Sequence, residues 1–273
     1  MKPPPGPFAL LIAFASLAII FSSVERFAAA LPRKPLFRRE RAVDFIYWFF
    51  TPWVSRTLTL IAAGIAVFIL SRFAHPSSAW FDAQPKALQI IEVLVAADVI
   101  GYATHRLFHR GSLWRIHAIH HSTEDLDWLS ATRLHPLNEV LARLAQIVPL
   151  YLLGMRGTAL ASVLPLFTFW AIFIHANVRW TFGPLRYVIA TPGFHRWHHT
   201  SESEGLDKNF AGLFAFYDLL FGTFHMPKGR QPARFGVESE NIPAGIWGQL
   251  LYPFRRPVRM ASAVELDAAP ARK

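Results

Sequence analysis

The chain of 273 residues contains no cysteine. It therefore has no disulfide scaffold, no cysteine-ligated zinc site, no iron–sulfur cluster and no thiol nucleophile. Any bound metal must be held by nitrogen or oxygen atoms. Charged residues are also scarce, at 17% against about 25% in ordinary soluble domains, while 53% of the residues are hydrophobic. This balance is typical of a membrane protein.

No linker rich in proline, glycine or serine divides the middle of the sequence, which favours one domain. Four apolar segments reach or approach the length needed to cross a bilayer, about 17–25 residues. They are residues 8–24, 57–71, 87–104 and 158–178. Residues 138–155 predict a shorter amphipathic or partly inserted helix, in a hairpin with 158–178 across Gly154 and Gly157. The aromatic run 45–53, interrupted by Pro52, predicts a position at the membrane–water boundary and not another span.

The distribution of basic residues predicts the orientation of the spans. One side would carry 23 lysines and arginines, and the other only Lys2, Arg72, Lys86 and Arg156. Because the cytoplasmic side carries the excess of positive charge, the histidine clusters described next should face the cytoplasm, in a bacterial inner membrane. The first segment, followed by Ala28 and two further alanines, also fits a cleaved signal peptide. The basic run after it favours an uncleaved anchor.

Histidine is the residue type that carries the chemistry. Eight of the twelve histidines form three clusters: His105 and His109 in HRLFH, His117, His120 and His121 in HAIHH, and His195, His198 and His199 in HRWHH. Spacings of three and four place imidazoles on one helical face, where two can reach one metal. Adjacent histidines diverge by about 100° around a helix and can serve two neighbouring ions. The repeated H-x-x-H-H pattern therefore predicts a dinuclear site.

Four further residues are candidates for the site. His135 and His175 are predicted ligands, because each lies at the end of a predicted helix, level with the clusters. Asp98 lies inside an apolar span, on one stripe with Tyr102, His105 and His109. An acid in such a span is usually functional or paired. We predict that Asp98 and Tyr102 orient a ligand, and a purely structural pairing of Asp98 is the alternative.

Arg133 and Asn138 flank His135 and have two possible roles. They would either hydrogen-bond to the site or anchor the following helix at the lipid headgroups. The nitrogen donors alone suit zinc, iron, copper or nickel. A zinc pair would make a hydrolase, whereas oxidation of an unreactive C–H bond requires iron and oxygen.

The order of these motifs resembles the fatty acid hydroxylase and sterol desaturase superfamily. The resemblance covers roughly residues 90–226: HRxxH, HxxHHS, a membrane hairpin, then HRWHH followed by DKNFAGLFAFYDLLFGTFHMP. It implies that the three boxes hold two iron ions, which activate O2 to hydroxylate or desaturate lipids. It also implies supporting roles for Asp207 and Asn209, in a stretch with Lys208, Asp218 and the turn at 221–224 that would close the cap over the metals.

We therefore expect an all-α integral membrane protein with about four transmembrane helices and a cytosolic, histidine-rich helical cap. Its expected regions are an anchor with two spans and a basic loop (1–86), a catalytic domain (87–226) and a basic, proline-containing tail (227–273). The predicted activity is O2-dependent hydroxylation, in preference to desaturation, of a membrane lipid such as a fatty acyl, sterol or isoprenoid chain. The alternatives are a membrane metal transporter or metal sensor, and a scaffold that has lost catalysis, against which the three intact boxes argue.

The reaction also needs electrons from outside this sequence. It contains neither a Gly-x-Gly-x-x-Gly fingerprint nor cysteines for a cluster. We expect an electron-donor protein, either an acidic ferredoxin or a b-type cytochrome with its reductase, to dock on the basic cytosolic face. The residues expected there are Arg196, Lys208, Lys228, Arg230 and Arg234. Orientation and anionic lipid binding explain these charges equally well, and their dispersal excludes nucleic acid as a partner.

Overall fold

The computed structural model describes residues 6–32, 35, 39–237 and 240–255. Arg33, Lys34 and Arg38 of the predicted basic loop, and residues 256–273 of the predicted tail, lie outside the described residues. Four helices are long and apolar enough to cross a membrane: α1 (Pro7–Ala28), α2 (Arg39–Leu70), α4 (Lys86–Phe108) and α7 (Gly157–His175). The described ranges contain no β-strand beyond one isolated bridge. The prediction of an all-α membrane protein with four spans is confirmed.

Helix α2 is longer than the sequence suggested. The aromatic run 45–53 and the apolar segment 57–71 belong to one helix of 32 residues, which continues through Pro52. At 1.5 Å per residue this helix is about 48 Å long, more than the roughly 30 Å of the hydrocarbon core. Tertiary contacts hold the segment before the proline, because Tyr47 is fully buried and the indole of Trp48 donates a hydrogen bond to the carbonyl oxygen of Leu10 at 3.0 Å. The first part of α2 also contacts the residues of η1 (Trp128–Thr132), since the hydroxyl of Thr132 donates to the carbonyl oxygen of Asp44 at 2.9 Å.

The predicted hairpin is present as α6 (Pro136–Leu152) and α7. Helix α6 packs against α2 and α4. The connecting turn needs a glycine at position 154, where φ is +74° and a Cβ atom would lie 2.3 Å from the carbonyl oxygen of Ser77. The short helix α3 (Ala79–Asp82) lies at the same end, and the indole of Trp80 donates to the carbonyl oxygen of Leu153.

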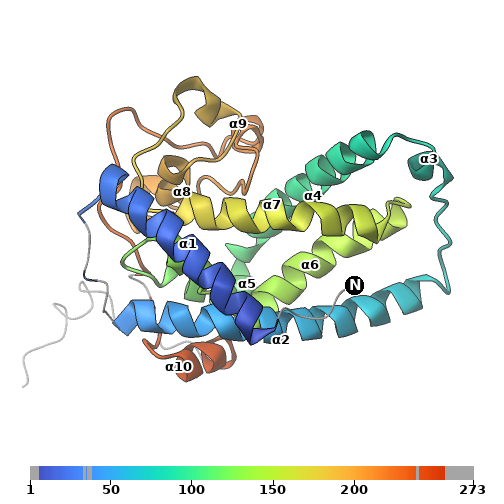
Figure 1. Cartoon of the computed structure of the whole chain (residues 1–273), viewed down its shortest axis with the longest axis horizontal. Helices are drawn as coiled ribbons and strands as arrows, with labels where there is room; N and C mark the ends of the chain where they lie inside the picture. The colour runs from blue at the N-terminus through green and yellow to red at the C-terminus, as the bar shows by residue number, and fades with distance from the viewer. Residues whose placement is uncertain (1–5, 33–34, 36–38, 238–239, 256–273) are drawn as a thin grey trace, which may run out of the picture.

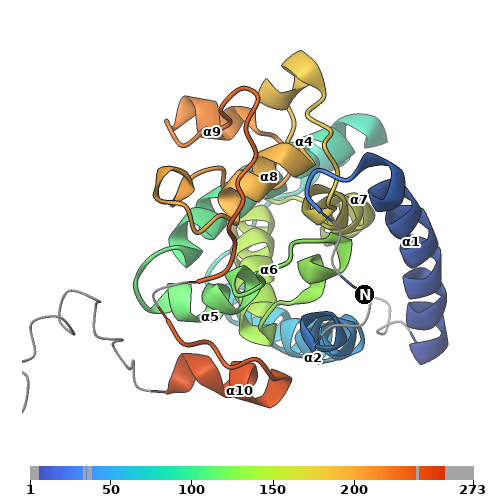
Figure 2. The ribbon, with the colours of Figure 1, turned by 90° about the vertical axis from the view of Figure 1, so that its left-hand side faces the viewer.

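The opposite end of the long helices carries a cap of short helices (Figures 1 and 2). Its elements are α5 (Gly111–His121), η1 (Trp128–Thr132), η2 (Gly183–Tyr187), α8 (Pro192–His198), η3 (Ser203–Gly205), α9 (Phe216–Leu220), α10 (Ile246–Leu251) and η4 (Tyr252–Phe254). Helix α1 runs along the outer flank of the bundle, as Figure 2 shows from the capped end.

An aromatic cluster and a buried carboxylate join α1 to the cap. Trp128 is fully buried, and its ring centroid lies 5.7–6.3 Å from those of Phe14, Phe21 and Trp48. One carboxylate oxygen of Glu25 accepts hydrogen bonds from the backbone amides of Trp128 and Asn177, at 3.0 and 2.9 Å. These contacts fix η1 and the segment after α7, and so position the histidine at the end of α7.

Candidate metal centre

Nine histidines converge where the spans meet the cap, in two groups that could each hold a metal ion. In each group the nearest imidazole nitrogens all lie within 4.8 Å of one another. Group one contains His105, His109, His117, His121 and His198, and group two contains His120, His175, His195 and His199. The groups are neighbours, since the rings of His121 and His199 stack at 4.3 Å between centroids.

The two H-x-x-H-H boxes contribute to the groups in a crossed pattern. The i, i+4 pair of α5, His117 and His121, belongs to group one, while His120 points into group two. In α8 the assignment is reversed: His195 and the adjoining His199 belong to group two, and His198 belongs to group one. Adjacent histidines are thus split between the groups, as the turn of 100° per helical residue requires. His105 of α4 and His109, which caps that helix, complete group one. His175, the last residue of α7, completes group two.

The protein fixes the orientation of most of these imidazoles through their outer nitrogens. The Nδ1–H groups of four histidines donate to backbone carbonyl oxygens: His105 to Phe210, His120 to Arg133, His175 to Ala171 and His198 to Lys208, at 2.6–3.1 Å. Two more find side-chain acceptors, His117 on Asn138 at 2.9 Å and His109 on Asp207 at 3.2 Å. A carbonyl oxygen can only accept, so Nδ1 carries the proton and the Nε2 lone pair is free for a metal.

The inner nitrogens are spaced as the ligands of a metal ion would be. Nε2 of His105 lies 3.0 Å from Nε2 of His117, and Nε2 of His120 lies 3.1 Å from that of His175. Because these nitrogens carry lone pairs and no proton, they cannot hydrogen-bond to each other. The spacing suits neighbouring ligands of one ion, since metal–imidazole bonds of about 2.0–2.1 Å place such nitrogens about 3.0–3.4 Å apart. The buried Nε2 atoms of His109 and His198 have no hydrogen-bond partner among the described residues.

Burial keeps the imidazoles of the cap neutral. Desolvation, reinforced by neighbouring imidazoles, lowers the pKa of every histidine in the α5 and α8 boxes. Neutral imidazoles are the form that binds metals, so the donor set is ready at neutral pH. The residues therefore fit two metal ions with nitrogen ligands.

His135 differs from the other nine candidates. It belongs to neither group, because its Nδ1 accepts a hydrogen bond from the backbone amide of Leu137 and its Nε2 lies 3.2 Å from the carbonyl oxygen of Leu250. It is the N-cap of α6, directly before Pro136. The structure thus does not bring His135 to the other predicted ligands, and both of its nitrogens are engaged by the backbone.

The acid and the tyrosine of α4 act at a distance from the histidines. The carboxylate of Asp98 accepts from the backbone amides of Leu213 and Phe214, at 3.2 and 2.9 Å. The hydroxyl of Tyr102 lies 3.0 Å from that of Thr223. Neither side chain hydrogen-bonds to a histidine. Asp98 thereby holds the end of the segment 210–214. The carbonyl oxygen of Phe210, at the start of this segment, orients His105.

Asp207 and Asn209 lie in the DKN stretch (residues 207–209) and have different contacts. Asp207 reaches His109 directly, and this hydrogen bond lowers the pKa of the Asp207 carboxyl. The amide of Asn209 donates to the carbonyl oxygens of Phe194 and His225, which ties α8 to the chain after α9. Both residues adopt positive φ, 54° and 59°. The carboxylate of Asp218 accepts hydrogen bonds from the backbone amides of Phe210 and Ala211. These bonds close the loop formed by residues 210–218.

Two residues that support the site were not predicted. The carboxylate of Asp44 in α2 lies 2.6 Å from Nε of Arg133, in a fully buried ion pair. The carbonyl of the same arginine orients His120. Glu25 in α1 fixes the backbone just after His175. Both acids lie in or beside apolar segments, the same signal that singled out Asp98.

One residue of the expected basic docking face is buried. Arg196 is 0% exposed and donates to the carbonyl oxygens of Ala176 and Val178 and to the side chain of Gln231. Burial lowers its pKa to about 10. It joins α8 to the chain after α7 and offers no charge to a partner, which corrects the expectation that it would lie on the surface.

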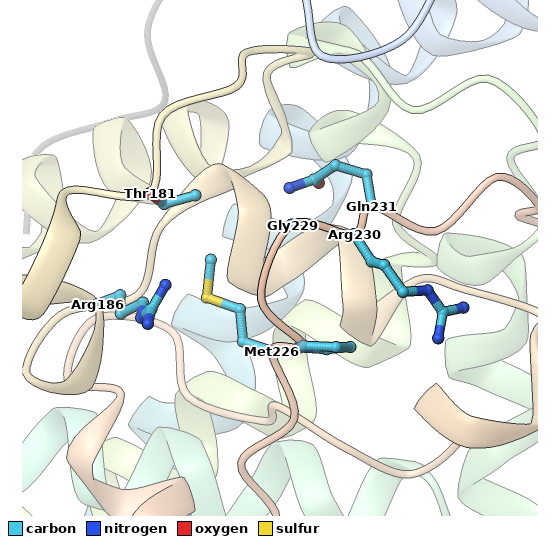
Figure 3. Close-up of a pocket in the computed structure, with 7 residues that line it drawn as sticks. Thr181, Arg186, Met226, Gly229, Arg230 and Gln231 are labelled. Carbon is cyan, nitrogen blue, oxygen red and sulfur yellow. The ribbon is translucent and has the colours of Figure 1, made fainter.

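A cavity of about 340 Å³ is lined by Thr181, Arg186, Met226 and Gln231, the last of which also accepts a hydrogen bond from Arg196 (Figure 3). Figure 3 shows the guanidinium of Arg230 pointing away from the other labelled side chains, and it pairs instead with Glu204.

Comparison with known proteins places these boxes in a family. The fatty acid hydroxylase family model matches residues 90–223. Ornithine lipid hydroxylase OlsE of Rhizobium tropici is 32% identical over 207 residues, which are 76% of this chain and 61% of that protein. The alkylglycerol monooxygenase of Caenorhabditis elegans is 29% identical over 147 residues (53% of this chain, 28% of that protein), and the Homo sapiens enzyme 31% over 136 residues (45% and 27%). No solved structure matches the chain.

The chain belongs to the fatty acid hydroxylase and sterol desaturase superfamily, which confirms the resemblance of the motifs. It spans less than two thirds of the length of these curated relatives.

Proposed function

We propose that this protein is an O2-dependent diiron enzyme that hydroxylates a membrane lipid. The observation that carries the proposal is the pair of adjacent all-imidazole groups at the cap end of four apolar helices. The names of the relatives, a lipid hydroxylase and a group of alkylglycerol monooxygenases, support hydroxylation over desaturation. A fatty acyl, sterol or isoprenoid chain would approach the groups from the bilayer. Residues 87–226 are the proposed catalytic domain, between the anchor (1–86) and the tail (227–273).

The nine grouped histidines are the proposed metal ligands, and the chain positions them for the reaction. The balanced hydroxylation converts R–H, O2, two electrons and two protons into R–OH and water. Two iron ions held by the groups would supply the reduction of O2 and the insertion of one oxygen atom. Residues of the chain orient the imidazoles through Asn138, Asp207 and backbone carbonyls. The buried rings of Phe108 and Phe210, which contact His117 and His109, help exclude water from the site.

The two electrons are proposed to come from a separate protein, a ferredoxin or a b-type cytochrome with its reductase. Of the five basic residues first considered for docking, Lys208 is partly exposed, and Lys228, Arg230 and Arg234 are exposed. The test uses the three exposed residues, Lys228, Arg230 and Arg234. Reversing these three charges should slow donor-dependent turnover and leave peroxide-driven turnover unchanged. Turnover with NADPH and O2 in the absence of any added protein would contradict an external donor.

The proposed location is a bacterial inner membrane, with the histidine groups facing the cytoplasm. Because the chain has no cysteine, single cysteines can be labelled without background. In intact cells, Ser77→Cys should react with an impermeant maleimide and Ser203→Cys should be protected. Equal labelling of both positions would contradict the proposed topology.

A metal transporter or sensor is less consistent with the arrangement. Transport requires ligands along a path through the spans and at both of their ends. Both histidine groups of the described chain lie at one end.

Lipid mass spectrometry tests the proposed activity. Cells that express the intact gene should contain a lipid that is heavier by one oxygen atom, and cells that express His120→Ala at the same level should lack it. The His135→Ala variant is the matched control and should still form the product. Identical lipid profiles with and without the intact gene would refute the proposed hydroxylation.

A further inference from the structure

A second cavity, of about 260 Å³, opens beside histidine group one. It lies between the end of α4, the DKN stretch and the turn after α9. The residues of its wall that carry the inference are Arg106, His109, Arg110, Asp207, Lys208 and Phe221. His109 is therefore both a member of group one and part of the cavity wall.

Three positive charges and only one negative charge line this small cavity, so its wall carries an excess of positive charge. Arg106, Arg110 and Lys208 form no ion pair with any residue that the structure describes, whereas Arg156 and Arg230 pair with Asp82 and Glu204. The one acid in the wall is Asp207, whose carboxylate accepts a hydrogen bond from His109 and keeps its negative charge. Like charges held close together repel one another unless an anion lies between them. The excess of positive charge in the wall thus favours an anionic ligand.

The position of the cavity indicates a lipid as the source of that anion. Arg106 lies in the last turn of α4, a helix apolar enough to span the membrane, and Arg110 lies just beyond it. Basic residues at such helix ends lie at the level of the lipid headgroups. Apolar side chains are exposed at the same place, with Leu107 56% and Phe221 55% exposed. A concave site of this volume accommodates a lipid headgroup.

We propose that this cavity binds the anionic headgroup of the lipid substrate, through a phosphate or carboxylate held by Arg106, Arg110 and Lys208. The guanidinium fork suits both oxyanions, because it donates two parallel hydrogen bonds. The alkyl chain leaves the cavity past Phe221. This inference rests on the proposed lipid hydroxylation and deepens it.

Binding measured without turnover tests the inference. The purified full chain in a neutral detergent is titrated with short-chain phosphatidylglycerol, with the neutral diacylglycerol of the same chain length and with inorganic phosphate. The anionic lipid should bind at least tenfold more tightly than either comparison ligand. Arg110→Gln should weaken its binding about tenfold, the equivalent of one charge-assisted hydrogen bond. Lys228→Gln, which removes one exposed positive charge outside the cavity, is the matched control and should leave binding unchanged.

Several results would overturn the proposal. Equal binding of inorganic phosphate would assign the cavity to a free ion. Equal weakening by Arg110→Gln and Lys228→Gln would show general attraction to a charged amphiphile. Unchanged lipid affinity with slower donor-dependent turnover would assign these cations to the donor protein. Because Arg110 is exposed, its substitution should preserve folding, which unchanged metal content verifies. Lipid binding can fail here while hydroxylation in cells persists, so the two proposals are tested separately.

Discussion

The buried ion pair between Asp44 and Arg133 should be one of the strongest single supports of the site. The two residues are 0% and 2% exposed, and Oδ1 and Nε are 2.6 Å apart. In Asp44→Ala the guanidinium stays buried without its partner, which costs about 3–5 kcal/mol. Typical domains have a total stability of about 5–15 kcal/mol, so this loss is a large fraction of it. Because the carbonyl of Arg133 orients His120, metal should be lost from group two before group one.

The assay is the free energy of unfolding from a titration with SDS in mixed micelles. Glu204→Ala is the matched control: it also removes one carboxylate of an ion pair, but the side chains of Glu204 and Arg230 are 37% and 56% exposed. Its cost should be about 0.2–1 kcal/mol. Replacing both partners in Asp44→Ala/Arg133→Met should recover at least half of the loss, because no unpaired charge remains buried. Equal losses in Asp44→Ala and Glu204→Ala, or a double variant with the summed loss of both single variants, would refute this reasoning.

Two further predictions concern the turn between α6 and α7 and the support of His117. Gly154→Ala should lower the unfolding free energy by more than about 1 kcal/mol, because φ is +74° and the new Cβ would meet the carbonyl oxygen of Ser77. Gly157→Ala, where nothing lies within 4 Å of the new atom, should lower it by less than about 0.5 kcal/mol; equal losses would contradict the steric argument. Asn138→Ala removes the acceptor of the His117 Nδ1–H and should weaken metal binding about 10–100-fold, as measured by competition with a chelator. An unchanged metal affinity would show that this hydrogen bond does not support the ligand.

The sequence predicts the membrane helices and the histidine groups well because both depend on local periodicity. Spacings of three, four and one within a box determine which imidazoles share a face, whatever the rest of the chain does. His135 was predicted as a ligand, and the structure places it outside both groups; the residues beside it favour another role. A residue before proline is extended and proline is favoured at the first helical position, so the His135–Pro136 pair fits the start of a helix.

The residues that hold the histidines in place from other helices could not be predicted in this way, because their roles depend on contacts between segments distant in the sequence. Glu25 meets Trp128 across 103 residues, and Asp44 meets Arg133 across 89. No local pattern records such a pairing, although an acid beside an apolar segment indicates that a partner must exist. The burial of Arg196 has the same origin, because its place on the inner side of α8 depends on packing against the chain after α7. For the same reason Pro52 does not end α2.

The metal content of the purified protein tests the central claim most directly. Elemental analysis of the full chain, purified without oxygen and with iron supplied, should give two iron ions per chain. His198→Ala should reduce this number, whereas His135→Ala should retain two, because His135 only caps α6. One ion per chain, or two ions retained in His198→Ala, would contradict a dinuclear centre built from these nine histidines.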